Sequence, residues 1–315
     1  MAAGAASCHP APVNRRAWIQ MSVLAALWGA SYMFIKVAID DVSPIIVVWV
    51  RLVLAALVLL PIAHSRGALA ELRPHLPTIL LLSVVQVAAP FLLITFGEQH
   101  IASALAGILV ASAPIFTALL AFRLDREELA TGWRLVGIMV GIVGVVLLFG
   151  VDLSGDSAAL LGGLMVLLAS LGYAIGPLQM KRRLQGVQPV GIAAATMTAA
   201  ALLLTPAVPF AWPSDAPGID TVASLLVLGA GGTGVAFLIF YTLIAEIGPG
   251  RATVVAYIAP GFSVVYGVVL LGESFTAGTA AGLMFILAGS WLAAGGRVSR
   301  SGLSRSTVPA PARAR

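Results

Sequence analysis

One arginine, Arg51, lies inside an apolar stretch of the sequence, where a charge is energetically unfavourable. Arg51 falls about seven residues inside an apolar run, which places it roughly 10 Å from the start of that run at 1.5 Å per helical residue. An arginine within a membrane-spanning helix normally faces a cavity or a partner, and its planar fork can bind a carboxylate through two hydrogen bonds. The alternative is structural: Arg51 extends toward the membrane surface or pairs with Asp40 or Asp41. Both interpretations stay open from the sequence.

Other polar-capable side chains lie deep inside further apolar runs. A binding cavity needs a few placed donors among apolar walls, so some of these side chains should line one, although core packing explains each of them equally well. Trp28 and Tyr173 carry extra weight because they are equivalent positions of an internal repeat. The candidate substrate-binding residues are Arg51, Trp28, Tyr32, Gln86, Tyr173, Thr233, Tyr241 and Tyr257.

The sequence shows no pattern of catalytic or metal-binding residues. It contains neither a G-x-x-x-x-G-K-[ST] phosphate loop nor an H-E-x-x-H zinc motif. The segment 229–234, GAGGTG, fits the dinucleotide pattern G-x-G-x-x-G, but it lies inside an apolar run and not between a strand and a helix. Its glycines suit close helix approach or an unwound segment facing a cavity. We therefore expect no enzyme activity, no cofactor and no metal site.

Composition places these residues in a membrane protein. Of 315 residues, 60% are hydrophobic and 10% are charged, whereas soluble domains carry roughly 25% charged residues. Apolar runs of about 20 residues recur along the chain, and that length crosses the hydrocarbon core of a bilayer. The single cysteine, Cys8, excludes an internal disulfide framework. The sequence thus predicts an all-α integral membrane protein with ten spans, at 17–38, 45–63, 77–97, 101–122, 132–150, 159–180, 188–209, 221–244, 251–271 and 277–295.

The ten spans divide into two copies of one five-helix unit. Residue pairs at offsets of 145 or 146 positions mark the duplication, namely Pro114 and Pro260, Glu127 and Glu273, Gly132 and Gly278, Lys36 and Lys181, and Pro44 and Pro189. Because five is odd, the second copy enters the membrane inverted, as in transporters that build two gates around a midplane site. The predicted domains are repeats at 17–150 and 159–296, with disordered cytoplasmic tails at 1–16 and 297–315.

Two of the repeated pairs have structural explanations. Pro114 and Pro260 each remove a backbone hydrogen bond and bend their helices, which suits either a gate or a static kink. Glu127 and Glu273 stand at the start of the fifth span of each repeat. A carboxylate there would lie at the positive end of the helix dipole and fix the turn, and a role in binding substrate is the alternative.

The basic residues predict the orientation in the membrane. Of the 18 Lys and Arg, 16 fall on one side of the spans, while Lys36 and Arg51 lie within them. By the positive-inside rule both termini are cytoplasmic, and the cluster at 181–183 (KRR) should contact anionic lipid on that side. This location explains the net charge of +5 without nucleic acid as a partner.

On these residues the chain resembles the EamA-type permeases of the drug/metabolite transporter superfamily. The resemblance covers about 17–296 and rests on LWGAS at 27–31, Lys36, Pro44, Arg51, ALAG at 104–107, PIFTALL at 114–120, and LGESFT at 271–276 with Gly282 and Gly289. The first copy departs from the pattern at 124–128, where LDREE stands in place of a Leu-Gly-Glu-Arg-like turn. The resemblance implies a ten-helix permease of a bacterial inner membrane that moves small organic solutes, often amino acids or related metabolites, outward.

The predicted function is secondary transport of small organic metabolites, such as amino acids, by alternating access around a midplane cavity. The protein would act as an exporter or exchanger, and a homodimer is compatible with this function. No Asp or Glu lies near the middle of a span, where a proton-coupled carrier usually places one. We therefore expect exchange or facilitated transport, or coupling through groups near the interface such as Glu98 or Glu246. Two alternatives remain. An antiporter of phosphorylated sugars or nucleotide-sugars would need several cavity cations, and a membrane scaffold would transport nothing.

Overall fold

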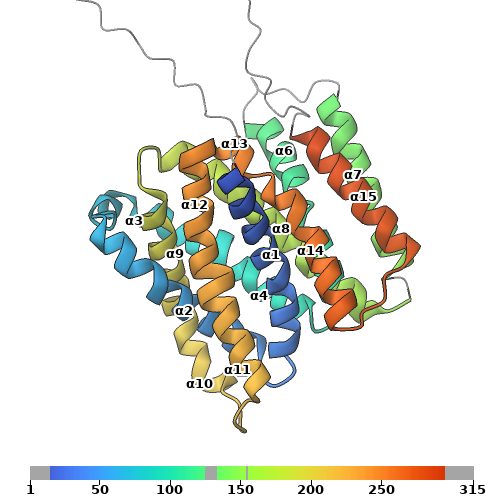
Figure 1. Ribbon diagram of the computed structural model, residues 1–315, viewed down its shortest axis with the longest axis horizontal. Coiled ribbons are helices and arrows are strands. Elements are labelled where there is room, and N and C mark those ends of the chain that lie inside the picture. The colour runs from blue at the N-terminus through green and yellow to red at the C-terminus, as the bar shows by residue number, and fades with distance from the viewer. Residues whose placement is uncertain (1–14, 125–132, 154, 295–315) are drawn as a thin grey trace, which may run out of the picture.

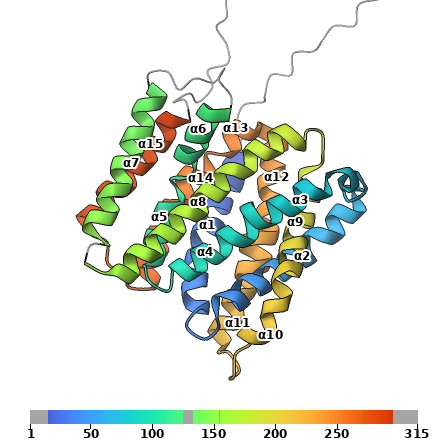
Figure 2. The same ribbon diagram turned by 180° about the vertical axis from the view of Figure 1, so that it is seen from behind.

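The computed structural model of the protein describes residues 15–124, 133–153 and 155–294. Throughout these residues the regular structure is helical (Figures 1 and 2). Eight helical segments are long and apolar enough to cross a membrane, and shorter apolar helices at Val255–Leu270 and Ala277–Ala293 bring the number to ten. The predicted fold class, an all-α membrane protein with ten spans, is confirmed.

The first half of the chain supplies five spans, and its third and fourth spans are each built from several helical pieces. Its elements in chain order are α1 (Arg15–Ala38), α2 (Pro44–Ser65), η1 (Ala70–His75), α3 (Leu76–Leu82), the π-helical η2 (Ser83–Ala88), α4 (Ala89–Gly97), α5 (Ser103–Val110), α6 (Ala113–Leu124) and α7 (Trp133–Val151).

The second half repeats this plan. Its elements are α8 (Ser157–Arg183), α9 (Pro189–Leu204), η4 (Thr205–Ala207), α10 (Val208–Ala211), α11 (Ile219–Leu226), the π-helical η5 (Val227–Val235), α12 (Ala236–Ile247), α13 (Pro249–Ala252), α14 (Val255–Leu270) and α15 (Ala277–Ala293).

Prolines and side-chain caps begin several of these helices. Pro44 and Pro189 occupy the first turns of α2 and α9, where the missing N–H costs no hydrogen bond. Asp156 accepts a hydrogen bond from the Ala158 N–H at the start of α8, and Thr276 forms a capping box at the start of α15. Local sequence therefore sets these helix starts.

The two halves pack in equivalent ways. α1 packs against α14, and its repeat counterpart α8 packs against α5 and α6; α2 packs against α9, and α7 against α15. α1 begins at the upper end of Figure 1, whereas α8 begins at the lower end, and α15 ends at the upper end. The structure thus fits the predicted architecture of two inverted five-helix repeats.

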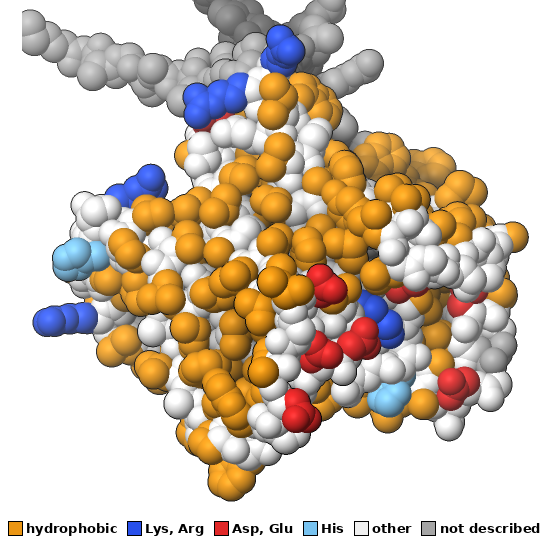
Figure 3. Space-filling model, turned by 60° about the horizontal axis from the view of Figure 1, so that its bottom comes forward, with side chains coloured by type: hydrophobic (Ala, Val, Ile, Leu, Met, Phe, Trp, Pro, Cys, Tyr) orange, Lys and Arg blue, Asp and Glu red, His pale blue; other side chains and the backbone are white. Residues whose placement is uncertain are grey.

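Polar contacts join the halves at the lower end of the molecule, where acidic side chains gather (Figure 3). Asp41 accepts hydrogen bonds from the Thr221 hydroxyl at 2.6 Å and from the Gly218 N–H at 2.9 Å. These bonds lower the pKa of the Asp41 carboxyl, and the bond from Thr221 has the largest effect. Asp152 accepts from the hydroxyl of Thr279 in the other half. These hydrogen bonds therefore join the two repeats at the lower end.

The repeated prolines do not act alike. α5 ends at Val110 and α6 begins at Ala113, so Pro114 stands in the first turn of a new helix. α14, in contrast, continues through Pro260. The predicted bend is thus an interruption in the first repeat, whereas in the second the proline lies inside a continuous helix. A gating role for either proline stays a prediction.

Candidate functional site

Arg51 lies at the contact between the two halves. Its side chain is 7% exposed, and its Nε donates a hydrogen bond of 2.8 Å to the Thr233 hydroxyl. Its guanidinium carbon lies 3.8 Å from the centre of the Phe91 ring, within the range of a cation–π interaction. Thr233 belongs to η5 of the second half and Phe91 to α4 of the first. Arg51 is therefore held by both repeats, and neither contact involves Asp40 or Asp41.

The π-helical geometry of η5 brings Thr233 to this position. The Thr233 hydroxyl donates to the carbonyl of Leu228, five residues earlier, at 3.0 Å, so its lone pairs remain available to accept from Arg51. A Cβ on Gly229 would lie 2.7 Å from the Leu54 Cβ and 3.2 Å from the Arg51 Cα. Gly229 thus allows η5 to approach α2 closely, and close helix approach is one of the two roles predicted for the glycines of the segment 229–234.

Two predicted tyrosines complete the surroundings of Arg51. Tyr32 on α1 and Tyr173 on α8 each interact electrostatically with Arg51 and with one another. We call Arg51, Tyr32, Phe91, Tyr173 and Thr233 the Arg51 cluster. It joins α1, α2, α4, α8 and η5, and its charge, hydroxyl groups and aromatic walls could bind a small anionic group.

Glu98 lies beside this cluster, in the connection between α4 and α5. Its side chain is 0% exposed, and neither carboxyl oxygen has a hydrogen-bond partner among the described residues. Burial raises the pKa of the Glu98 carboxyl well above its usual range, against the opposing charge of Lys36. The Lys36 ammonium instead donates to the backbone carbonyls of Glu98 and Ile101, at 2.5 and 3.0 Å.

Phe91 and Glu98 were absent from the predicted binding residues. They are seven residues apart, two helical turns, so Glu98, directly after the end of the third span, lies on the same side of it as Phe91. Glu98 also follows an apolar run directly. An aromatic residue and a carboxylate on one helix face could have indicated these positions, but which neighbours that face meets is a tertiary property.

Two predicted binding residues belong to a separate aromatic group. Trp28 on α1 lies with its ring centre 6.2 Å from that of Phe237 and 5.2 Å from that of Phe240. Tyr241 contacts the same two rings at 5.9 and 6.0 Å. Tyr173, the repeat counterpart of Trp28, lies in the Arg51 cluster instead. The equivalence of these two positions in sequence does not bring them into one site.

The remaining candidates contact other helices. Gln86, in η2, packs against α8 at Gly176, where a Cβ would overlap the Gln86 amide. The Tyr257 hydroxyl donates to the Ser290 carbonyl at 3.3 Å and so joins α14 to α15.

Glu273 caps a different helix from the one expected. The sequence predicts its carboxylate at the start of the span at 277–295, but Thr276 caps that helix. Glu273 instead accepts hydrogen bonds from the N–H groups of Ser103 and Ala104, at 2.6 and 2.9 Å. It therefore stabilises the N-terminus of α5 in the other half. Its repeat partner Glu127 lies outside the described residues.

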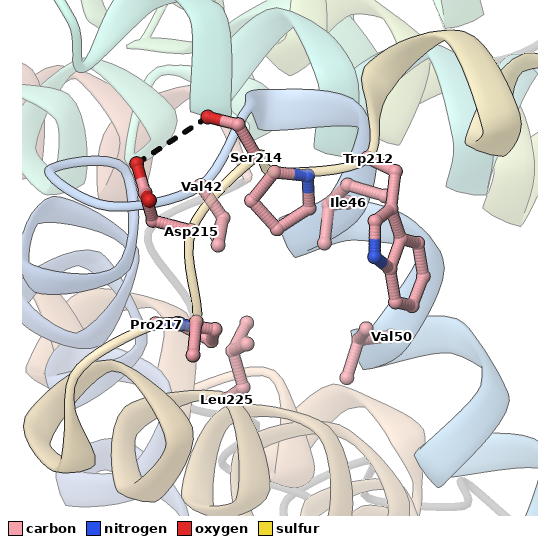
Figure 4. Close-up of a pocket in the computed structure, with 10 residues that line it drawn as sticks. Val42, Ile46, Val50, Trp212, Ser214, Asp215, Pro217 and Leu225 are labelled. Atoms are coloured by element: carbon pink, nitrogen blue, oxygen red, sulfur yellow. Dashed lines mark hydrogen bonds between the residues drawn. The ribbon is translucent and has the colours of Figure 1, made fainter.

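A pocket of about 410 Å³ opens at the lower end, between α2, α11 and the connection 212–217 (Figure 4). Val42, Ile46, Val50 and Leu225 are among the residues that line it, and the hydroxyl of Ser214 donates to Asp215. The lining is mainly apolar and contains no member of the Arg51 cluster. In the part of the chain that the structure describes, no three His, Cys, Asp or Glu side chains are grouped as metal ligands.

Comparison with known proteins identifies the family. The sequence pattern of the EamA-like transporter family matches residues 16–150 and again 160–295. The uncharacterised transporter YoaV of Bacillus subtilis is 26% identical over 270 residues, covering 84% of this chain and 92% of YoaV. The uncharacterised inner membrane transporter YedA of Escherichia coli K12 is 28% identical over 260 residues, covering 80% and 82%.

Two further similarities agree with this assignment. A probable amino-acid metabolite efflux pump of Salmonella typhimurium is 28% identical over 294 residues, covering 86% of this chain and 92% of that protein. One crystal structure shares the fold with a TM-score of 0.65 at 20% identity, covering 88% of this chain and 97% of that one. The chain belongs to the EamA-like transporter family and is a multi-pass membrane transporter, not an enzyme.

Proposed function

We propose that this transporter exports or exchanges small organic metabolites such as amino acids, and that Arg51 binds the carboxylate of the solute. The observation that carries the proposal is the placement of Arg51 between the inverted repeats. Contacts made with both halves can change when the halves move, and alternating access requires a site of that kind.

The hydrogen bonding of Arg51 leaves its fork available. Nε is bonded to Thr233, and the two terminal nitrogens have no hydrogen-bond partner in the described part of the chain. A guanidinium presents these nitrogens in a geometry that matches a carboxylate. Tyr32 and Tyr173 supply hydroxyl groups beside it, and Phe91 excludes water from one face of the guanidinium. A small carboxylate-bearing solute fits this combination.

The orientation and direction of transport are part of the proposal. The positive-inside rule places both termini in the cytoplasm, so the lower end in Figure 1 is the outer face and the bonds of Asp41 hold it closed. The basic cluster at 181–183 would contact anionic lipid on the cytoplasmic side. Outward transport is favoured by the Salmonella relative, which is named an efflux pump for amino-acid metabolites.

A phosphorylated solute is the weaker candidate. Phosphate recognition generally uses several cationic donors. Lys36, which the sequence also places within the spans, donates to two backbone carbonyls. Among the described residues of the Arg51 cluster, Arg51 is thus the one cation that could bind an anion. One guanidinium suits a single carboxylate better than a phosphate.

Counterflow in proteoliposomes tests the proposal. Vesicles loaded with a mixed pool of amino acids and small metabolites would contain the wild type, Arg51→Ala, Arg51→Lys or Arg66→Ala. Arg66 is the matched control because it lies exposed at the end of the same helix. We expect exchange of carboxylate-bearing solutes by the wild type and by Arg66→Ala. Loss of a charge-assisted bond should reduce it about tenfold or more in Arg51→Ala, and Arg51→Lys should restore only part.

Each contrary result has a definite meaning. Equal exchange by the wild type and Arg51→Ala would make Arg51 a structural residue and would overturn its assignment to the site. The absence of exchange for every solute in the wild type would contradict the proposed substrate class.

A further inference from the structure

Glu98 is a buried carboxyl group that binding of a solute at Arg51 does not require. Its side chain is fully buried, and both carboxyl oxygens lack a hydrogen-bond partner among the described residues. Burial of an ionised carboxylate without hydrogen bonds is so unfavourable that such groups normally take up a proton instead. The geometry around Glu98 therefore suits the neutral acid.

The neighbouring charges do not replace the missing hydrogen bonds. Lys36 on α1 directs its ammonium to the carbonyls of Glu98 and Ile101, and Arg51 on α2 is bonded to Thr233. Both cations interact with the Glu98 carboxyl only at longer range. The oxygens of Glu98 thus have nearby positive charge but no donor in contact.

The other ionisable groups near Glu98 favour its neutral form or leave it unchanged. The carboxylate of Glu273, in the connection between α14 and α15, interacts repulsively with Glu98, and Tyr32 on α1 interacts with it as a further acidic group. On the side of α8, Gly97 packs against Val166 and the backbone of Gly162. His100, in the same connection as Glu98, packs against Gly162 of α8.

Two other carboxyl groups show what Glu98 lacks. Glu273 receives two backbone N–H donors. Glu246 lies 3.8 Å from Arg16, and both of their side chains are partly exposed to solvent. Glu273 thus has direct donors, and Glu246 has a neighbouring cation and access to solvent. Glu98 has neither a donor in contact with its carboxyl oxygens nor exposure to solvent among the described residues.

We propose that Glu98 is a proton-binding site of the transport cycle, neutral while the outer face is closed and ionised when that face opens to water. The proposal rests on the proposed function, in which the two halves separate at the outer face. The proton comes from the outer aqueous phase as the face closes, and it returns there when the face reopens. The opening and closing of the outer face thus respond to the pH of the outer solution.

The direction of this response follows from linkage. The closed conformation has the higher pKa at Glu98 and so binds the proton more tightly than the open one. Closure is therefore favoured below the ordinary pKa of a glutamate and is progressively lost as the pH rises toward the raised pKa. Between these two pKa values, one proton shifts the ratio of open to closed by up to about tenfold per pH unit.

Spin-label distances across the outer face test this inference in proteoliposomes. Labels would be attached to Gln99→Cys and Ser274→Cys, at exposed positions in two outer connections, with Cys8→Ser as the background. We expect a short distance at low pH and a growing population of longer distances as the pH rises. The variant Glu98→Gln should abolish that pH dependence, whereas Glu246→Gln, the matched control, should keep it.

A second measurement on the folded wild type protects the test against a variant that does not fold. The infrared C=O stretch of a protonated, water-shielded carboxyl should be present in the wild type near neutral pH and absent in Glu98→Gln. The inference is overturned if the wild type lacks that band or shows no pH response, or if Glu98→Gln responds as the wild type does. Failure of the proposed function would give a different result. Wild-type counterflow would then be absent, whatever the spin-label distances show.

Discussion

At the residue scale, the position of Arg51 depends on one hydrogen bond and one aromatic ring from different halves. Thr233 supplies the hydrogen bond, and Phe91 supplies the ring. The side chain of an arginine has many rotamers, and restricting them when a solute binds weakens the affinity. Partners that already hold the side chain in one rotamer reduce that cost. In the proposed site, the Thr233 hydroxyl therefore acts through Arg51 as a positioning group.

The variant Thr233→Val removes the hydroxyl that holds Arg51 and keeps the shape of the side chain. Hydrogen bonds to charged groups contribute about 1.5–3 kcal/mol, so we expect KM for carboxylate-bearing solutes to rise about tenfold in counterflow assays. The matched control is Thr196→Val at the repeat position of Arg51, where a buried threonine bonds only to carbonyls of its own helix. An equal rise in KM for both variants would contradict the positioning role.

At the element scale, two π-helical segments occupy equivalent places in the repeats. η2 begins at Ser83 and η5 covers the matching position 228, and π-helical turns are frequent at functional sites. In η5 the extra residue per turn presents Thr233 to Arg51. The glycines beside it let the backbone of η5 approach α2.

The variant Gly229→Ala tests this close approach. A Cβ at this position would lie 2.7 Å from the Leu54 Cβ, and overpacking of this kind costs about 1–3 kcal/mol. We expect a lower Tm in detergent together with weaker counterflow, because α2 carries Arg51. Gly231→Ala is the matched control, since the nearest atom to its Cβ lies 3.8 Å away in the same helix. Two equally destabilised variants would show that the whole segment, and not this one contact, resists substitution.

At the scale of the whole molecule, the ends of the repeats at the bottom of Figure 1 are held together by hydrogen bonds to carboxylates. Asp41 bonds to Thr221 and Gly218, and Glu273 bonds to the N-terminus of α5. Each bond links residues well over 100 positions apart in the chain. The proposed closure of this face thus depends on residues of both halves.

Asp41 gives this closure a dependence on pH. Its hydrogen bonds lower the pKa of its carboxyl, and the bond from Thr221 has the largest effect. Its contribution to stability is therefore present above the ordinary pKa of about 3.9 and is lost as the pH falls through the lowered value. We expect Asp41→Asn to lower Tm at neutral pH and to flatten the decline of Tm in acid. Asp40→Asn, an exposed neighbour, is the control, and an identical change in both variants would contradict the assignment.

The candidate site shows which of its residues can be predicted from residue type alone, without knowledge of the fold. Arg51, Tyr32, Tyr173 and Thr233 are polar groups within apolar runs, so their cost in the membrane marked them in advance. Trp28 and Tyr241 satisfied the same criterion, yet they pack with Phe237 and Phe240. Glu98 was named only as a coupling group near the interface, because its position at a span end gives no sign of its complete burial.

The sequence by itself determined the ten spans, the internal duplication and the family, because apolar length and repeated spacing are local properties set by the thickness of the hydrocarbon core. Only the tertiary structure decided that Arg51 bonds to Thr233, that Glu273 caps α5 rather than the helix after it, and that Glu98 lies buried without a donor. These facts depend on which faces of distant helices meet. A repeat offset relates equivalent residues, but it does not say which of them come into contact.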